Sequence, residues 1–215
     1  MANKQQPAVM TAYDVREIIR KGALKSELEM ERAVWAERSL RLISKDQPEL
    51  DSLRKEVRNL IIQYESVHWS DVELVTDQQV RESESAEKRV KKEFKFFQKR
   101  KELILKKLKK YKLNQNDLGE ILAHGKSYIS ELLNGTRSFS MNDLVIIHRL
   151  FDISLEDLIC IEISADVEKR IKATLEKAAA NSSKSKNPSQ VSSLVKALYS
   201  KNAFPPNESL YEFPS

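Results

Sequence analysis

One stretch of the chain, residues 112–159, carries helix-start and helix-stop signals spaced so closely that it can form only short helices. Asn114, Ser140 and Ser154 each precede a run of periodic apolar residues, and each is followed three residues later by an aspartate. Such residues cap free backbone N–H groups, and acidic side chains in a first turn interact favourably with the helix dipole. Asn134-Gly135 is a stop signal, because glycine readily takes the left-handed conformation after a last turn. We predict helices at about 99–111, 115–122, 126–133, 141–150 and 155–161.

The second and third of these helices have the internal pattern of a helix-turn-helix. Leu118 and Leu122 face the core, and Gly119 takes the position where the two helices cross closely. Ile129 and Leu132 anchor the recognition helix. An ordinary helical domain without a DNA role is the alternative, but the combined caps, small residue and Asn-Gly stop favour the helix-turn-helix. The predicted five-helix core is completed by Leu108, Leu144, Ile147, Leu150, Ile153 and Leu158.

The first exposed residues of a recognition helix reach base edges in the major groove. Here these are Lys126, Ser127 and Ser130, with Tyr128 on the flank. Lys126 can donate to guanine O6 or N7, whereas Ser127 discriminates less because a hydroxyl both donates and accepts. The alternative for Tyr128 is contact with the sugar-phosphate backbone. Glu131 has two readings, an acceptor from cytosine N4 or a member of an internal ion pair.

Four further residues are candidates for phosphate contact. Gln115 opens the first helix of the pair, where a side-chain amide and free backbone N–H groups can hold a phosphate. Asn134, Thr136 and Arg137 follow the recognition helix, although Asn134 can serve purely as the helix stop. Residues 81–112 carry 14 Lys and Arg against 5 Asp and Glu. This charge lies next to the motif, so phosphate contact and a merely solvated helix face both remain open.

The regions around the motif are predicted to be helical as well. Helices are expected over 11–22, from Ser26 to a break at Gln47-Pro48, and again through Tyr64. They form a hairpin whose hydrophobic core is too small to be very stable alone, so dimerisation would stabilise it. Its predicted buried face includes Leu28, Val34, Trp35, Leu40, Leu42, Ile43, Leu50, Leu53, Val57, Leu60 and Ile61.

A charged stretch without glycine or proline, residues 82–111, reads as a linker helix that can continue into the first helix of the next domain. Residues 178–190 have linker composition, and residues 191–199 have helical spacing. The predicted organisation is a dimerisation or partner region at 8–80, a basic linker helix at 81–98, the helix-turn-helix domain at 99–163, and a C-terminal helix with a flexible tail at 164–215. The fold class is all-α.

Composition excludes several other classes of protein. With only four glycines and a charged fraction of 32%, a many-stranded sheet is not expected. No apolar run approaches the length of a membrane span, the first ten residues lack a signal core, and Cys160 has no disulfide partner, so a cytoplasmic protein is expected. His68, His124 and His148 lack partners at metal-ligand spacing. No phosphate loop, nucleophile elbow or paired catalytic carboxylates occur, so neither an enzyme nor a cofactor is expected.

Residues 99–160 resemble the lambda-repressor/Cro class of helix-turn-helix. Within that class, residues 127–137 (SYISELLNGTR), followed by Ser140 and residues 147–150 (IHRL), are similar to antitoxins of the HigA family. Residues 36–66 resemble the helical N-terminal region of those antitoxins less specifically. The chain departs from the family pattern at Ala123, where glycine is usual, at His124, where an apolar residue is common, and at Thr136, where a basic residue is common.

The resemblance implies an antitoxin that binds a palindromic operator in its own promoter as a homodimer and neutralises a HigB-like mRNA-cleaving toxin of the RelE fold. A free-standing repressor of phage or chromosomal origin, with no toxin partner, is the main alternative. A scaffold whose helix-turn-helix no longer binds DNA is the third.

Overall fold

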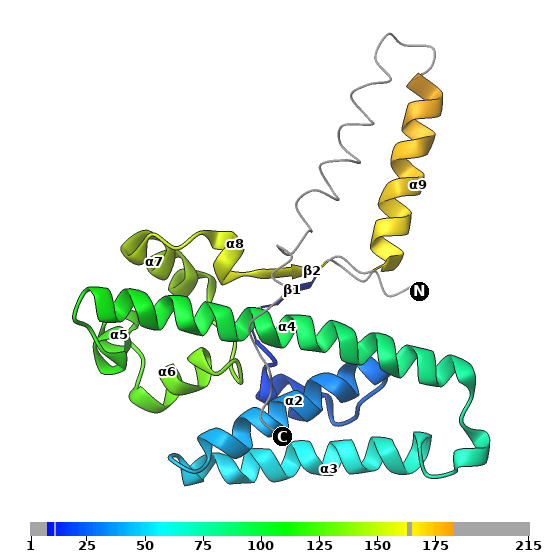
Figure 1. The fold of residues 1–215 in the computed structure, drawn as a ribbon, viewed down its shortest axis with the longest axis horizontal. Helices are drawn as coiled ribbons and strands as arrows, with labels where there is room; N and C mark the ends of the chain where they lie inside the picture. Colours follow the sequence, from blue (N-terminus) through cyan, green and yellow to red (C-terminus); the bar gives the residue numbers. More distant parts are fainter. Residues whose placement is uncertain (1–7, 11, 163–164, 183–215) are drawn as a thin grey trace. The chain divides into compact units, whose positions relative to one another are not determined.

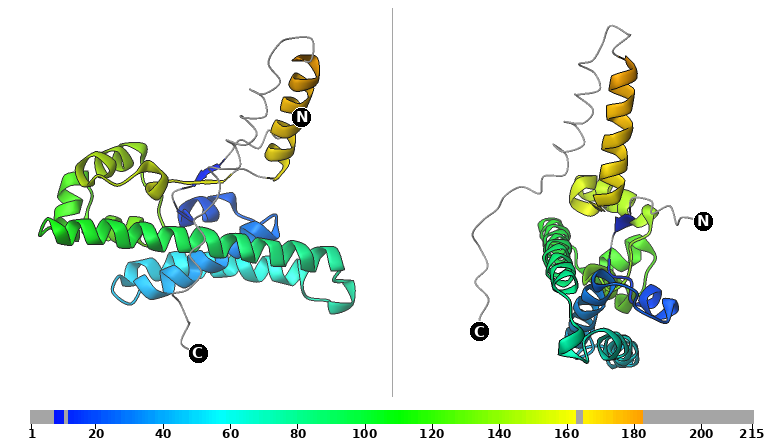
Figure 2. Two further views of the ribbon diagram at one scale, coloured as in Figure 1. Left: turned by 45° about the horizontal axis from the view of Figure 1, so that its top comes forward. Right: turned by 90° about the vertical axis from the view of Figure 1, so that its right-hand side faces the viewer.

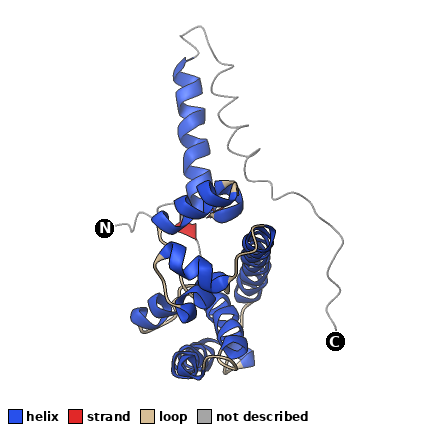
Figure 3. Ribbon diagram, turned by 90° about the vertical axis from the view of Figure 1, so that its left-hand side faces the viewer, coloured by secondary structure: helices blue, strands red, loops and turns tan. Residues whose placement is uncertain are grey.

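The computed structural model describes residues 8–10, 12–162 and 165–182 (Figure 1). Residues 9–160 form one compact unit, and residues 161–182 belong to a second, so each unit is described by itself. The described elements are helical except for two short strands, β1 (Ala8–Met10) and β2 (Cys160–Glu162), which pair in a two-stranded sheet (Figure 3). The predicted all-α fold class is confirmed.

The longest described helix, α4 (Asp77–Lys110), serves both hydrophobic cores of the compact unit. Its buried side chains return every three or four residues without an intervening glycine or proline, so one face stays covered along its length. Val90 and Phe97 enter the first core, and Ile104 and Leu108 enter the second. The charged stretch and the first helix of the next domain are therefore one continuous helix. The boundaries predicted at residues 80 and 98 both fall within it.

The first core is built by α1 (Val15–Lys21), α2 (Glu27–Ile43), α3 (Asp51–His68) and the N-terminal half of α4. α2 and α3 form the predicted hairpin, and α2 packs against both α3 and α4 (Figures 1 and 2). A 3-10 turn, η1 (Pro48–Leu50), joins the two helices at the predicted break, and a second, η2 (Val72–Leu74), precedes α4.

Local capping explains where these helices begin and end. Asp14 accepts from the backbone N–H of Glu17, and Ser26 accepts from that of Glu29. Gly22 ends α1 at a φ of 71°, in the left-handed conformation that favours glycine. The prediction that Leu42 is buried is wrong, because its side chain is 65% exposed. It lies two positions from the buried Leu40 and so on the other side of α2.

The second core is the predicted five-helix domain. The C-terminal half of α4 packs with α5 (Gln115–Leu122), α6 (Lys126–Leu133), α7 (Met141–Phe151) and α8 (Leu155–Leu158). Leu150 was expected in this core but is 49% exposed, and the next residue, Phe151, is buried instead at 1%. α8 ends at Leu158 rather than near 161, because the backbone turns extended at Ile159 and enters β2. Cys160, the first residue of β2, is buried at 2%.

The second unit contains α9 (Ala165–Ser182). This helix includes residues 178–182, which were predicted to begin a linker, so that prediction is wrong for these five positions. The rest of the linker, the helix predicted at 191–199 and the tail lie outside the described residues. None of the helices in the described ranges is long and apolar enough to cross a membrane.

Candidate nucleic-acid interface

Gly119 lies where α5 passes α6, and the structure leaves no room there for a side chain. A Cβ at this residue would lie 2.7 Å from the backbone oxygen of His124 and 3.4 Å from Cγ1 of Ile129. The first distance is shorter than real contacts allow, and its partner is backbone, so a larger residue would push the turn away from α5. The prediction that a small residue sits at this crossing is confirmed.

The turn between the two helices does not use glycine for its left-handed residue. Ala123 takes φ 56° and ψ 42°, while Gly125 is extended at φ −68°. His124 fixes the turn from the other side: its Nε2 lies 3.1 Å from Oδ1 of Asp143 at the start of α7, and its ring stacks on Tyr128 at 4.4 Å. The departures at Ala123 and His124 therefore leave the helix-turn-helix geometry intact.

The four predicted base-contacting residues lie together on the first part of α6. Lys126 is its first residue and is exposed, whereas Ser127, Tyr128 and Ser130 are half-buried. The Tyr128 ring lies 4.2 Å from the guanidinium carbon of Arg137. Ser127 has partners that the sequence did not reveal, since its hydroxyl lies 2.8 Å from Oε1 of Gln47 and 3.2 Å from Oε1 of Glu49.

Two of the predicted phosphate-contacting residues lie at very different depths. Gln115 is exposed at the first position of α5, beside the capping box that Asn114 and Asp117 form. Thr136 is fully buried, and its hydroxyl donates to the carbonyl of Glu131 at 3.3 Å. The predicted phosphate contact of the Thr136 side chain is therefore contradicted, since that hydroxyl is enclosed by protein.

The other two follow α6 and already have protein partners. Asn134 donates from Nδ2 to the carbonyl of Ser130 at 2.8 Å and accepts from Nζ of Lys101 at 2.7 Å. It acts as the predicted helix stop, followed by Gly135 at φ 72°. Arg137 is half-buried, and its Nη2 lies 3.3 Å from Oε1 of Glu131. Their contact with phosphate stays a prediction.

Of the two roles predicted for Glu131, the structure shows the internal ion pair. It is 4% exposed and forms ion pairs with Arg137 and with Arg16 of α1. The backbone N–H groups of Tyr13 and Val15 also donate to the carbonyls of Gly135 and Thr136, at 2.9 and 3.1 Å. Sequence reasoning missed this strap, residues 13–16, because no local pattern marks a contact between residues so far apart in the chain.

The positive segment 81–112 does not lie wholly at the surface. Arg100 is 1% exposed, with its guanidinium carbon 5.2 Å from the ring centroid of Phe97 and 4.9 Å from that of Phe139. It donates to the carbonyl of Leu158, and burial lowers the pKa of its guanidinium to about 10. Arg100 thus holds α4 to the end of α8. The exposed basic residues near the end of the segment are Lys106, Lys109, Lys110 and Lys112.

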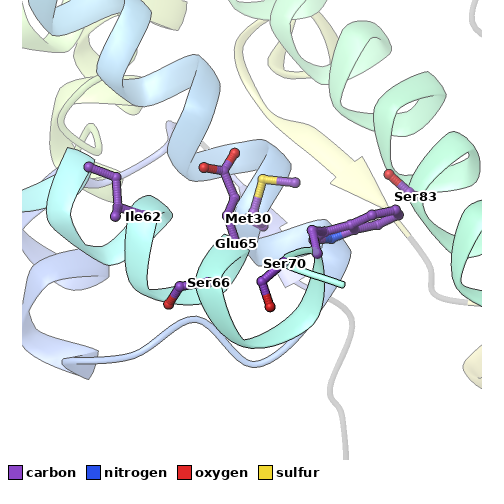
Figure 4. Close-up of a pocket in the computed structure, with 7 residues that line it drawn as sticks. Met30, Ile62, Glu65, Ser66, Ser70 and Ser83 are labelled. Atoms are coloured by element: carbon purple, nitrogen blue, oxygen red, sulfur yellow. The ribbon is translucent and has the colours of Figure 1, made fainter. Parts of the chain in front are cut away.

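An open pocket is lined by side chains of α2, of the C-terminal end of α3 with the residues that follow it, and of α4 (Figure 4). None of the predicted DNA-contacting residues lines it. Its lining combines apolar and hydroxyl side chains with one carboxylate: Met30, Ile62, Glu65, Ser66, Trp69, Ser70 and Ser83. In the described ranges no group of three or more His, Cys, Asp or Glu side chains could hold a metal ion.

Comparison with known proteins agrees with the geometry of the second core. Residues 104–158 match the family model described as Helix-turn-helix. Comparisons of the chain with curated proteins and with solved structures give no match. The matched residues cover the end of α4 and all of α5–α8. Residues 104–158 are therefore a helix-turn-helix domain of the lambda-repressor/Cro type, the fold of DNA-binding transcriptional regulators.

Proposed function

We propose that this chain is a HigA-type antitoxin that represses its own promoter as a dimer and neutralises a HigB-like mRNA-cleaving toxin. The observation that carries the DNA-binding part is the α5–α6 pair, with Gly119 at the crossing and Lys126 exposed at the start of the recognition helix. The antitoxin part is supported by the similarity of residues 127–137, Ser140 and residues 147–150 to that family.

In this proposal each interface residue has a defined task. Lys126 donates to guanine in the major groove, and three neighbours add contacts along the same face: Ser127, Tyr128 and Ser130. Gln115 holds a phosphate at the N-terminus of α5, where the helix dipole favours an anion. Arg137 and the exposed lysines at the end of α4 add positive charge for further phosphates.

Dimerisation is assigned to the N-terminal region because large apolar side chains remain exposed on its helices. Leu42, Ile62 and Val67 are 65%, 50% and 75% exposed. A two-fold dimer would cover apolar surface of this kind and match a palindromic operator, since closed two-fold dimers dominate among homo-oligomers.

The DNA-binding part is tested by titrating the chain with a fragment of its own promoter and with random DNA of equal length. We expect a clear preference for the promoter fragment. If a dimer neutralises ~6–10 phosphates, affinity should fall by roughly 10³–10⁵ between 50 and 200 mM salt. Equal affinity for both DNAs, or an affinity that does not change with salt concentration, would contradict the proposal.

The antitoxin part is tested by looking for a neighbouring gene that encodes a small basic protein of about 90–120 residues and co-expressing that protein with this chain; an isolated gene would favour the free-standing repressor. We expect the two to co-purify and the chain to rescue growth from the toxicity of its neighbour. A chain that binds its promoter specifically but neither co-purifies nor rescues growth is a free-standing repressor instead.

A further inference from the structure

We propose that the turn between α2 and α3, residues 44–50, masks the start of the recognition helix, and that specific DNA binding requires this contact to open. We call these residues the hairpin tip. The inference rests on the DNA-binding function proposed above and concerns the regulation of the same site.

The contact lies on a residue predicted to read bases. The hydroxyl of Ser127 is 2.8 Å from Oε1 of Gln47 and 3.2 Å from Oε1 of Glu49, and it can donate to either. A hydroxyl has a single hydrogen to donate, so a base acceptor would have to replace these two side chains. Because the tip already lies within hydrogen-bond distance of Ser127, a base edge and the tip cannot occupy the same space.

The negative charge of the hairpin tip also opposes DNA binding at the start of α6. Glu49 and the neighbouring Asp46 are exposed acidic residues of the tip. Glu49 approaches the start of α6, an eight-residue helix with no side-chain N-cap and no acidic residue in its first turn. Free N–H groups and the helix dipole favour an anion at such an end. The Glu49 carboxylate supplies that negative charge from within the chain, and it repels an approaching phosphate.

The side chains of Gln47 and Glu49 can turn away from Ser127 without disturbing either core. Ile43, just before the tip, and Leu50, its last residue, are buried in the first core at 7% and 3%. Arg54 ties α3 to α2 through Glu37, at 3.1 Å. The turn is thus fixed on its own hairpin, whereas the described hydrogen bonds between the tip and α6 all end on the Ser127 hydroxyl. Because so few hydrogen bonds hold the contact, the chain exists as a closed and an open population. Its apparent affinity for DNA is proportional to the fraction of molecules that is open.

The test measures promoter binding by the full chain carrying Gln47→Ala and Glu49→Ala together. We expect the double variant to bind promoter DNA about 2.5- to 4-fold more tightly than the unaltered chain, because the closed population loses the hydrogen bond from the Ser127 hydroxyl. Asp46→Ala is the matched control, since it removes one negative charge from the same turn but no contact with Ser127; we expect less than a twofold change. Thermal unfolding of all variants confirms that each remains folded.

Three outcomes would overturn the inference. Equal promoter affinity of the unaltered chain and the double variant would show that the tip masks nothing. Weaker binding by the double variant would make the tip part of the DNA interface. An equally large gain in promoter affinity for Asp46→Ala would show that the effect comes from net charge and not from the contact with Ser127. If neither the unaltered chain nor any variant prefers promoter over random DNA, the proposed function fails first, and the mask with it.

Discussion

The N-terminal region touches the recognition helix near both of its ends, and the two contacts differ in kind. Near the C-terminal end, the strap of residues 13–16 is paired through backbone hydrogen bonds to Gly135 and Thr136, and Arg16 reaches the buried Glu131. Val15 of the strap is fully buried. At the N-terminal end, the hairpin tip meets Ser127 through two acceptors for one hydroxyl, the half-buried Gln47 and the exposed Glu49.

The difference separates a structural contact from a removable one. Breaking the strap would leave buried backbone groups without partners and remove one of the two arginines that pair with the buried Glu131 carboxylate, which is costly. Opening the tip exchanges one part-exposed hydrogen bond for a bond to water, which costs little. The C-terminal end of α6 is therefore fixed to the rest of the unit, while its N-terminal end, which carries Lys126, can be uncovered.

The largest effect is expected at the strap. Glu131→Ala should lower the free energy of unfolding by about 2–3 kcal/mol, because Arg16 and Arg137 lose a buried partner. Urea unfolding followed by circular dichroism measures the change, with Glu131→Gln as a milder control that keeps the shape. A loss under about 0.5 kcal/mol would mean that the strap is held by its backbone and apolar contacts alone.

At the other end of α6, Lys126→Ala should cost about 1–3 kcal/mol of binding free energy on the operator and relax the preference at one base pair. Stability should not change, because this side chain is exposed. Arg137→Ala is the comparison: it should weaken operator and random DNA alike and also lower stability through Glu131. Identical DNA-binding defects in both variants would mean that the base-contacting residues have been assigned to the wrong positions.

A smaller effect is expected in the turn that precedes α6. Ala123→Gly should raise the free energy of unfolding by about 0.5–1 kcal/mol, because glycine takes a φ of 56° without the cost of a Cβ. The change leaves both contacts on α6 untouched, so it sets a baseline for variants in this region. Thermal unfolding measures it, and a destabilised variant would contradict the assigned backbone strain.

The smallest effect on stability is expected for Ser127→Ala. Removing this hydroxyl should lower the free energy of unfolding by about 0.5–0.8 kcal/mol, because one part-exposed hydrogen bond is lost while Gln47 and Glu49 can turn to water. Urea unfolding beside Glu131→Ala compares the two ends of α6 directly. A loss as large as that of Glu131→Ala would show that the tip is as firmly held as the strap.

The short helices of the second core were predictable because their signals are local. A cap such as Ser140 and a stop such as Gly135 act within one helical turn, and Gly119 marks a crossing between neighbouring helices. Predictions failed where a position depended on distant neighbours. Leu42 and Leu150 are apolar, yet they point away from the helices that cover the rest of their faces.

The candidate site shows the same division in its individual residues. The sequence placed Lys126 and Gln115 at exposed helix starts, because helix boundaries fix such positions. It did not reveal that Thr136 is enclosed or that Ser127 is covered, because both depend on segments more than seventy positions away in the chain. The sequence alone determined which helices form and where α5 and α6 cross, since those follow from nearest-neighbour hydrogen bonds and spacing. Only the tertiary structure decided what covers each end of the recognition helix, because that depends on how the N-terminal hairpin packs along α4.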